Sequence, residues 1–183
     1  MYEKFKELDG THPWRDVSPD GFIDYGARYR SRGRVLYFNF PLAKELELVP
    51  SDHPSLIDCD LEQAVLETFS LQIINEYDLR VGKKYPTETV RPGCYMATRY
   101  LQTQHRNKQG KTSGDGRSIW NGFLRTSNLI FDISSRGTGA TILSPGAQES
   151  DGAVKTGDES YGYSSGLAEL DEMLGGAVMS EIF

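Results

Sequence analysis

Two kinds of hydrophobic pattern run along the chain. Short stretches rich in β-branched and aromatic residues predict strands, and they occupy residues 34–40, 94–105, 117–124 and 128–134. Helical spacing predicts a helix over 60–78 that Asp60 can cap, with apolar residues at Leu61, Val65, Phe69 and Ile73. A short helix is expected over 41–48, because proline is tolerated in the first helical turn. Strands and helices are therefore mixed along the chain.

A second amphipathic pattern closes the chain over 167–183. Its apolar stripe consists of Leu167, Leu170, Leu174, Ala177, Val178 and Ile182. Gly175 and Gly176 interrupt this helix and weaken it by roughly 1 kcal/mol each. The pattern reaches Phe183 without a cap or a polar tail, so we expect the natural polypeptide to be longer.

These patterns predict an α+β fold, an antiparallel sheet with helices packed on it. Residues 1–33 contain Pro13, Pro19 and several glycines that break any period, and are expected to form an irregular lead-in. Residues 34–183 are expected to form the folded region. A length of 183 residues fits a single domain.

Composition excludes several functional classes. The net charge of −6 gives no overall attraction to nucleic acid or to an anionic membrane, and no apolar run is long enough to span a bilayer. The two cysteines, 35 residues apart, form neither a disulfide framework nor a CxxC site. We therefore expect a cytoplasmic protein with no membrane partner and no specific nucleic-acid partner.

Positive charge is nevertheless concentrated in two regions, so a local anion site is compatible with an acidic chain. The first is YGARYRSRGR (25–34), whose arginines and tyrosines would suit single-stranded RNA or a solvated strand edge. The second runs from Arg99 to Arg117 and ends in the stretch TSGDGR (112–117). An Asp-Gly pair between strands is a common hairpin turn, but glycines also let backbone N–H groups approach an anion.

The order of elements in the second half adds weight to the anion-binding interpretation, although a meander of strands followed by a helix is itself a common arrangement. A glycine turn ending in Arg117 lies between two strands, the third strand ends at Arg136, and a helix carrying Glu172 follows. The small lobe of protein kinases has this order, with a glycine-rich hairpin over the ATP phosphates and a helix glutamate that holds a strand cation.

Four segments resemble the N-terminal part of the SelO (YdiU) family, and they occur in the family's order across residues 36–183. They are LYFNFPLAKEL, SGDGR, DISSRGTGAT and DEMLGGAVMSEIF. The resemblance implies a kinase-like fold that binds ATP with Mg²⁺ and transfers AMP to Ser, Thr or Tyr hydroxyls of protein substrates.

The resemblance also implies roles for individual residues. Gly114, Gly116 and Arg117 match the nucleotide-contacting glycine loop, Arg136 stands at the family's phosphate-binding lysine, and Glu172 matches the glutamate that pairs with that lysine. Asp158, in Gly157-Asp158, matches a second Gly-Asp-Gly motif, for which Asp151-Gly152 is the rival. Glu181 is a rival for the role of Glu172.

Two departures from the family pattern affect the expected activity. Arginine in place of lysine keeps the charge of Arg136 but replaces a compact ammonium with a planar fork. The family's catalytic Asp and metal ligands are expected beyond residue 183, so no catalytic residue or metal ligand is assigned in this chain. The expected function is ATP binding without transfer by this fragment alone, and the alternative is a non-catalytic protein-interaction module or a degenerate remnant of the family.

Overall fold

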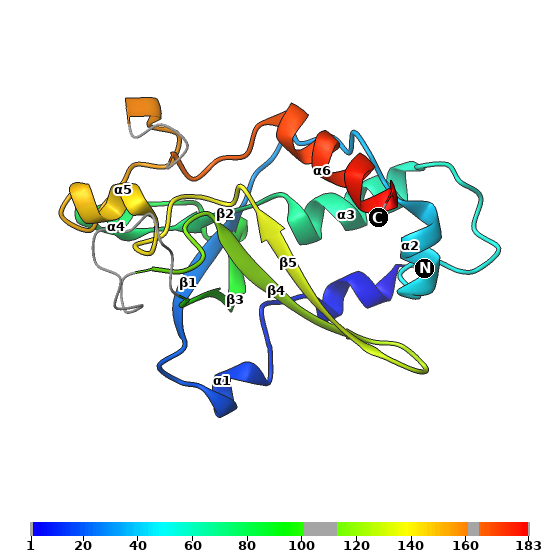
Figure 1. The fold of residues 1–183 in the computed structure, drawn as a ribbon. Helices are drawn as coiled ribbons and strands as arrows, with labels where there is room; N and C mark the ends of the chain where they lie inside the picture. Colours follow the sequence, from blue (N-terminus) through cyan, green and yellow to red (C-terminus); the bar gives the residue numbers. More distant parts are fainter. Residues whose placement is uncertain (1, 101–112, 161–164, 183) are drawn as a thin grey trace.

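The computed structural model describes residues 2–100, 113–160 and 165–182, and its centre is a five-stranded antiparallel sheet (Figure 1). The strand order is β2-β1-β3-β4-β5, where β1 is Phe22–Tyr29, β2 Leu71–Ile74, β3 Val90–Thr98, β4 Ser118–Arg125 and β5 Ile130–Arg136. The helices are η1 Glu3–Glu7, α1 Trp14–Val17, α2 Phe40–Glu45, α3 Cys59–Phe69, α4 Glu76–Arg80, η2 Thr87–Thr89, α5 Pro145–Glu149 and α6 Leu170–Ile182. The predicted α+β class is confirmed.

The expectation of an irregular lead-in over residues 1–33 is wrong. The segment contains η1, α1 and β1, and β1 lies inside the sheet between β2 and β3. Tyr25 and Ala27 are buried on one face of β1, which is the alternation expected of a strand. Gly26 interrupts the strand-like composition of this segment in the sequence. In the structure it is part of β1 and pairs with Ile74 of β2.

The predicted strand over 34–40 is also wrong. No residue of 33–39 is assigned to a strand, and α2 begins at Phe40 with the Asn39 side chain capping the Leu42 N–H at 3.0 Å. The Val35 N–H donates to the Glu62 carboxylate of α3, so a side chain and not a strand takes this backbone donor. The aromatic residues Phe38 and Phe40 still pack against the core.

The predicted helix over 60–78 is shorter in the structure. It is α3 and ends at Phe69, after which Leu71–Ile74 form β2. Ile73 fits both periods, four residues after Phe69 and two after Leu71, so the helical spacing continued past the end of the helix. The strands expected at 117–124 and 128–134 are confirmed as β4 and β5, whereas β3 begins before the predicted 94–105 and residues 101–112 lie outside the described part.

Hydrophobic side chains form two main clusters on the sheet. One joins η1, α2 and α3 to β4 through residues such as Phe5, Leu61 and Leu124. The other joins β1, β2, β3 and β4 to the loop after β5 through Tyr25, Ile73, Tyr95, Ile119 and Leu143. Among the described helices, none is both long and apolar enough to cross a membrane.

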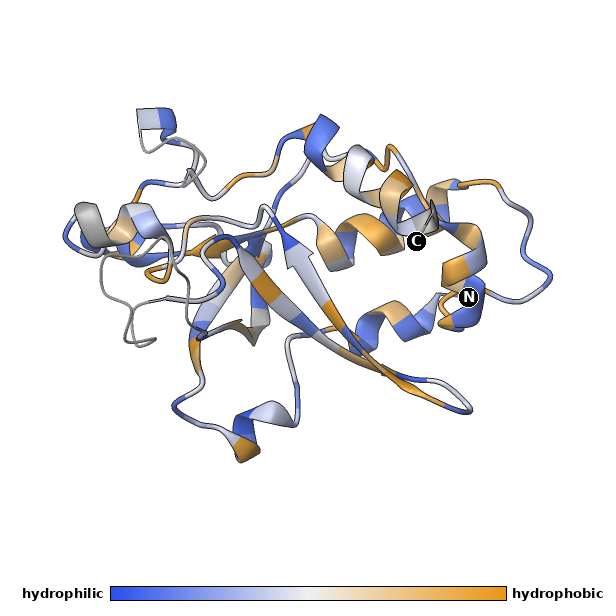
Figure 2. Ribbon diagram, viewed as in Figure 1, coloured by the Kyte–Doolittle hydropathy of each residue, from blue (hydrophilic) through white to orange (hydrophobic). Residues whose placement is uncertain are grey.

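The C-terminal helix α6 is confirmed, but most of its apolar stripe does not face the core. Three large residues of the stripe, Leu170, Leu174 and Val178, are 39 to 59% exposed, and the neighbouring Met179 is 49% exposed. Figure 2 shows α6 at the upper surface of the molecule with hydrophobic segments along its length. Its helical periodicity therefore does not come from burial within the described part of this chain.

Candidate functional site

The Gly-Asp-Gly turn before β4 is fixed on two sides. The Asp115 carboxylate accepts hydrogen bonds from the Thr98 N–H at 3.0 Å and from the Thr98 hydroxyl at 2.6 Å. On the other side, the Thr141 hydroxyl donates to the Asp115 carbonyl at 2.6 Å, and the Thr141 N–H donates to the Gly116 carbonyl at 3.0 Å. The turn is therefore attached both to the end of β3 and to the loop that follows β5.

The protein's own packing accounts for both glycines of this turn. A Cβ atom on Gly114 would lie 2.1 Å from the Thr98 carbonyl oxygen, and one on Gly116 would lie 2.9 Å from the Cα atom of Ser144. Gly114 is buried. These glycines permit close contact between backbone segments, which is one of the two uses expected for them, and their contacts do not require a ligand.

Arg117 is held in a fixed orientation immediately before β4. Its Nη1 atom donates to the Leu167 carbonyl at 3.1 Å and to Glu172 Oε2 at 3.0 Å, and its Nη2 atom contacts Glu172 Oε1. This is a two-point guanidinium–carboxylate contact, which has both geometric specificity and charge. The hydrogen bonds from Arg117 lower the pKa of Glu172, and attraction to Arg117 and Arg136 adds to this effect.

The expected ion pair between Arg136 and Glu172 is not the one that forms, because Glu172 pairs with Arg117. Ala168 lies beside Gly137, where an added Cβ would be 2.8 Å from that of Ala168, so the segment before α6 packs on the turn after β5. Together with the Leu167–Arg117 hydrogen bond, this packing brings the first turn of α6 to Arg117.

Arg136 is nevertheless close to the same site. It is exposed at the end of β5 and lies opposite Ser118, the residue that follows Arg117. Its attraction helps to lower the pKa of Glu172. The structure therefore brings Arg117, Arg136 and Glu172 together, with Arg117 and not Arg136 as the hydrogen-bonded partner of Glu172.

Asp158 does not join this group through any hydrogen bond that the structure shows. Its carboxylate accepts from the Ser160 N–H at 3.0 Å and from the Ser160 hydroxyl at 2.6 Å, and these bonds lower its pKa. The rival Asp151 has a positive φ of 53° and its carbonyl accepts from Arg80 at 2.8 Å. The Glu181 side chain lies outside the described part of the structure.

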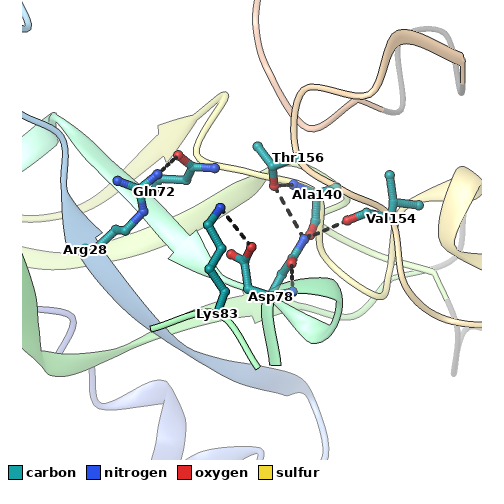
Figure 3. Close-up of polar contacts among 8 residues, drawn as sticks. Arg28, Gln72, Asp78, Lys83, Ala140, Val154 and Thr156 are labelled. Atoms are coloured by element: carbon teal, nitrogen blue, oxygen red, sulfur yellow. Dashed lines mark hydrogen bonds and ion pairs between the residues drawn. The ribbon is translucent and has the colours of Figure 1, made fainter. Parts of the chain in front are cut away.

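Sequence reasoning missed the residue that anchors the loop after β5. Asn75 is 1% exposed, and its side-chain N–H groups donate to the carbonyls of Ala140 at 2.7 Å and Val154 at 2.9 Å. Its side-chain oxygen caps the Asp78 N–H of α4 at 3.2 Å. Figure 3 draws hydrogen bonds to Ala140, Val154 and Thr156 as dashed lines that meet beside Asp78. The sequence could have indicated Asn75 as the cap of a helix that begins at Glu76. Its hydrogen bonds to residues far along the chain could not be predicted from neighbouring residues.

The basic segment 25–34 is partly absorbed into the sheet. Arg28 donates to Gln72 Oε1 at 2.6 Å, and its guanidinium lies 4.6 Å from the centre of the Tyr85 ring. Arg91 lies over the Tyr29 ring at 5.2 Å. These contacts account for an arginine and a tyrosine of the segment without an RNA ligand.

Within the described residues, no group of three or more His, Cys, Asp and Glu side chains could hold a metal ion. In comparisons with known proteins, no family model, no curated protein and no solved structure matches the chain.

Proposed function

We propose that this chain is the nucleotide-binding part of a SelO-like protein adenylyltransferase, and that Arg117 and Arg136 bind the polyphosphate of ATP. The observation that carries the proposal is the two-point contact between Arg117 and Glu172 beside the exposed Arg136. A pre-oriented guanidinium next to a second cation suits phosphate oxygens, because both charges act at one place. The motif resemblance supplies the nucleotide as the ligand class.

The fit to ATP differs between the two parts of the site. Arg117 is only 23% exposed at its side chain but is oriented by Glu172, whereas Arg136 is exposed, so Arg136 would contact phosphate first. Gly114 and Gly116 are used by internal packing and would shape the turn without cradling a phosphate. Bound Mg-ATP would supply the adenylyl group and the charge-neutralising cation. We propose binding without transfer for this chain, since the catalytic residues of the family are expected outside it.

Calorimetric titration of the 183-residue chain with Mg-ATP tests this function. We expect saturable binding that weakens by roughly ten- to hundredfold in Arg136→Ala and in Arg117→Ala, because hydrogen bonds to charged groups contribute about 1.5–3 kcal/mol. Arg125→Ala is the matched control, since Arg125 is an exposed arginine at the opposite end of β4. Circular dichroism checks that each variant is folded. A folded wild-type chain without ATP affinity, or an equal loss in Arg125→Ala, would contradict the proposal.

The exposed apolar face of α6 favours a second candidate, a protein-interaction module without nucleotide affinity. Leu170, Leu174 and Val178 recur at four-residue spacing and are all exposed. Such a face is typical of a docking helix. The same titration separates the candidates, because an interaction module predicts an intact fold and no heat of ATP binding.

A further inference from the structure

A cavity of about 490 Å³ lies away from the Arg117–Glu172 pair. It is formed by α1 and the residues around it, the end of β3, and the strands β4 and β5. Its lining includes Trp14, Tyr100, Trp120, His12 and Asp132, and it contains neither Arg117, Arg136 nor Glu172. The cavity is therefore a separate candidate site, and its volume suits a small organic ligand.

Three aromatic side chains from different parts of the chain contribute to the lining. Trp14 comes from α1, Tyr100 follows β3, and Trp120 belongs to β4. The His12 ring lies edge-on to Trp120 with 5.1 Å between ring centres, which fixes one wall. The negative faces of aromatic rings attract organic cations, most strongly for tryptophan.

A carboxylate completes the lining. The backbone N–H of Trp14 donates to His12 Nδ1 at 3.1 Å, so Nδ1 is unprotonated and His12 Nε2 carries the proton. His12 Nε2 then donates to Asp132 Oδ1 at 2.9 Å. The Asp132 side chain is 54% exposed, and this hydrogen bond leaves its second oxygen to other donors. A negative charge therefore stands beside aromatic walls.

We propose that this cavity binds a small ligand through a quaternary ammonium group, with the cation against Trp14, Tyr100 and Trp120 and its charge balanced by Asp132. A quaternary ammonium group suits such a site because it binds aromatic faces and has no N–H donor that needs an acceptor. Arg99 also lines the cavity, but it follows β3, two strands away from Asp132 on β5. Two strand spacings place the backbones of Arg99 and Asp132 about 10 Å apart.

Tryptophan fluorescence reports directly on this site, because the two tryptophans of the chain, Trp14 and Trp120, both line the cavity. We expect choline to change the fluorescence saturably. The uncharged isostere 3,3-dimethylbutanol should bind at least tenfold more weakly, since it has the same shape without the charge. Equal binding of the two compounds, no response to choline, or binding of nucleosides in preference to choline would overturn the proposal.

Variants test the assignment of the charge. We expect Asp132→Asn to weaken choline binding about tenfold, because it removes the carboxylate charge and keeps the shape. The exposed Asp52→Asn is the matched control and should bind choline as the wild type does. If Asp132→Asn does not fold, Trp14→Leu takes its place, with calorimetry as the readout and the same tenfold loss expected. Unchanged choline affinity in the folded variant overturns the proposal. Arg136→Ala should leave choline binding intact, since this site does not depend on the proposed nucleotide function.

Discussion

Glu76 is a half-buried carboxyl group whose environment changes its proton affinity. The Tyr25 hydroxyl donates to Glu76 Oε1 at 2.7 Å and accepts from the Ile142 N–H at 2.9 Å, linking β1, α4 and the loop after β5. Burial raises the pKa of Glu76, and the hydrogen bond from Tyr25 opposes this rise. Burial has the larger effect, so the pKa of Glu76 is higher in the folded protein than in water. Glu76 is therefore a source of pH-dependent stability.

We predict that Glu76→Gln becomes progressively more favourable relative to wild type as pH rises. The folded-state pKa of Glu76 lies above the unfolded value of about 4.3, so its contribution is fully present below that value and is lost as pH rises through the folded pKa. A glutamine does not ionise, so it loses no stability as pH rises, and its side-chain oxygen can still accept the hydrogen bond from the Tyr25 hydroxyl. Urea unfolding at about pH 5 and pH 8 measures the difference. Glu88→Gln, an exposed control, should show no trend. A pH-independent difference for Glu76→Gln would contradict the prediction.

The candidate site was predictable only in part: three of its members lie near one another, Asp158 bonds to Ser160 and not to them, and the pairing of Glu172 differs from the expected one. The order of strand, glycine turn, strand and helix indicated that Arg117, Arg136 and Glu172 would lie near one another, and they do. The choice of Arg117 as partner of Glu172 depends on how Leu167 and Ala168 pack on the turn after β5. Such packing joins distant segments and leaves no local signal in the sequence.

At the scale of elements, sequence reasoning succeeded where one period was unambiguous. The strands β4 and β5 and the helix α6 were predicted because their apolar residues follow a single pattern. It failed at Ile73, which fits both a helix and a strand, and at residues 34–40, where Phe38 and Phe40 reach the core without strand pairing. The period of an element is readable from a sequence, whereas the partner of each backbone N–H depends on segments far away in the chain.

Glycine-to-alanine substitutions separate the effect of helix propensity on stability from the effect of tertiary packing. We predict that Gly175→Ala and Gly176→Ala raise the helix content and stabilise α6 by up to about 1 kcal/mol each, because both glycines lie in α6 with open space around an added Cβ. Gly114→Ala should instead destabilise the protein by roughly 1–3 kcal/mol, because its Cβ would meet the Thr98 carbonyl. Far-UV circular dichroism with urea unfolding measures both changes. A loss of stability in the α6 variants would show that these glycines have tertiary contacts.

At the scale of the whole molecule, the N-terminal segment is a structural part of the domain. Phe5 in η1 is 2% exposed and packs edge-to-face on Phe69 of α3 with 6.4 Å between ring centres. Tyr2 hydrogen-bonds to the buried His53 at 2.7 Å, and Gly10 donates to the Asn121 carbonyl of β4 at 2.8 Å. One short segment thus joins α3, the loop around His53 and β4.

We therefore predict that Phe5→Ala destabilises the whole domain by about 3–5 kcal/mol, the usual cost of removing a buried phenylalanine ring. The loss should appear in one cooperative transition, because η1 contributes to the cluster that also holds α2, α3 and β4. Tyr37→Ala is the control, since Tyr37 is 52% exposed, and should cost about 0.5 kcal/mol or less. Urea unfolding followed in parallel by tryptophan fluorescence and far-UV circular dichroism measures both. If Phe5→Ala cost no more than Tyr37→Ala, the first residues would be an appendage on a core complete without them.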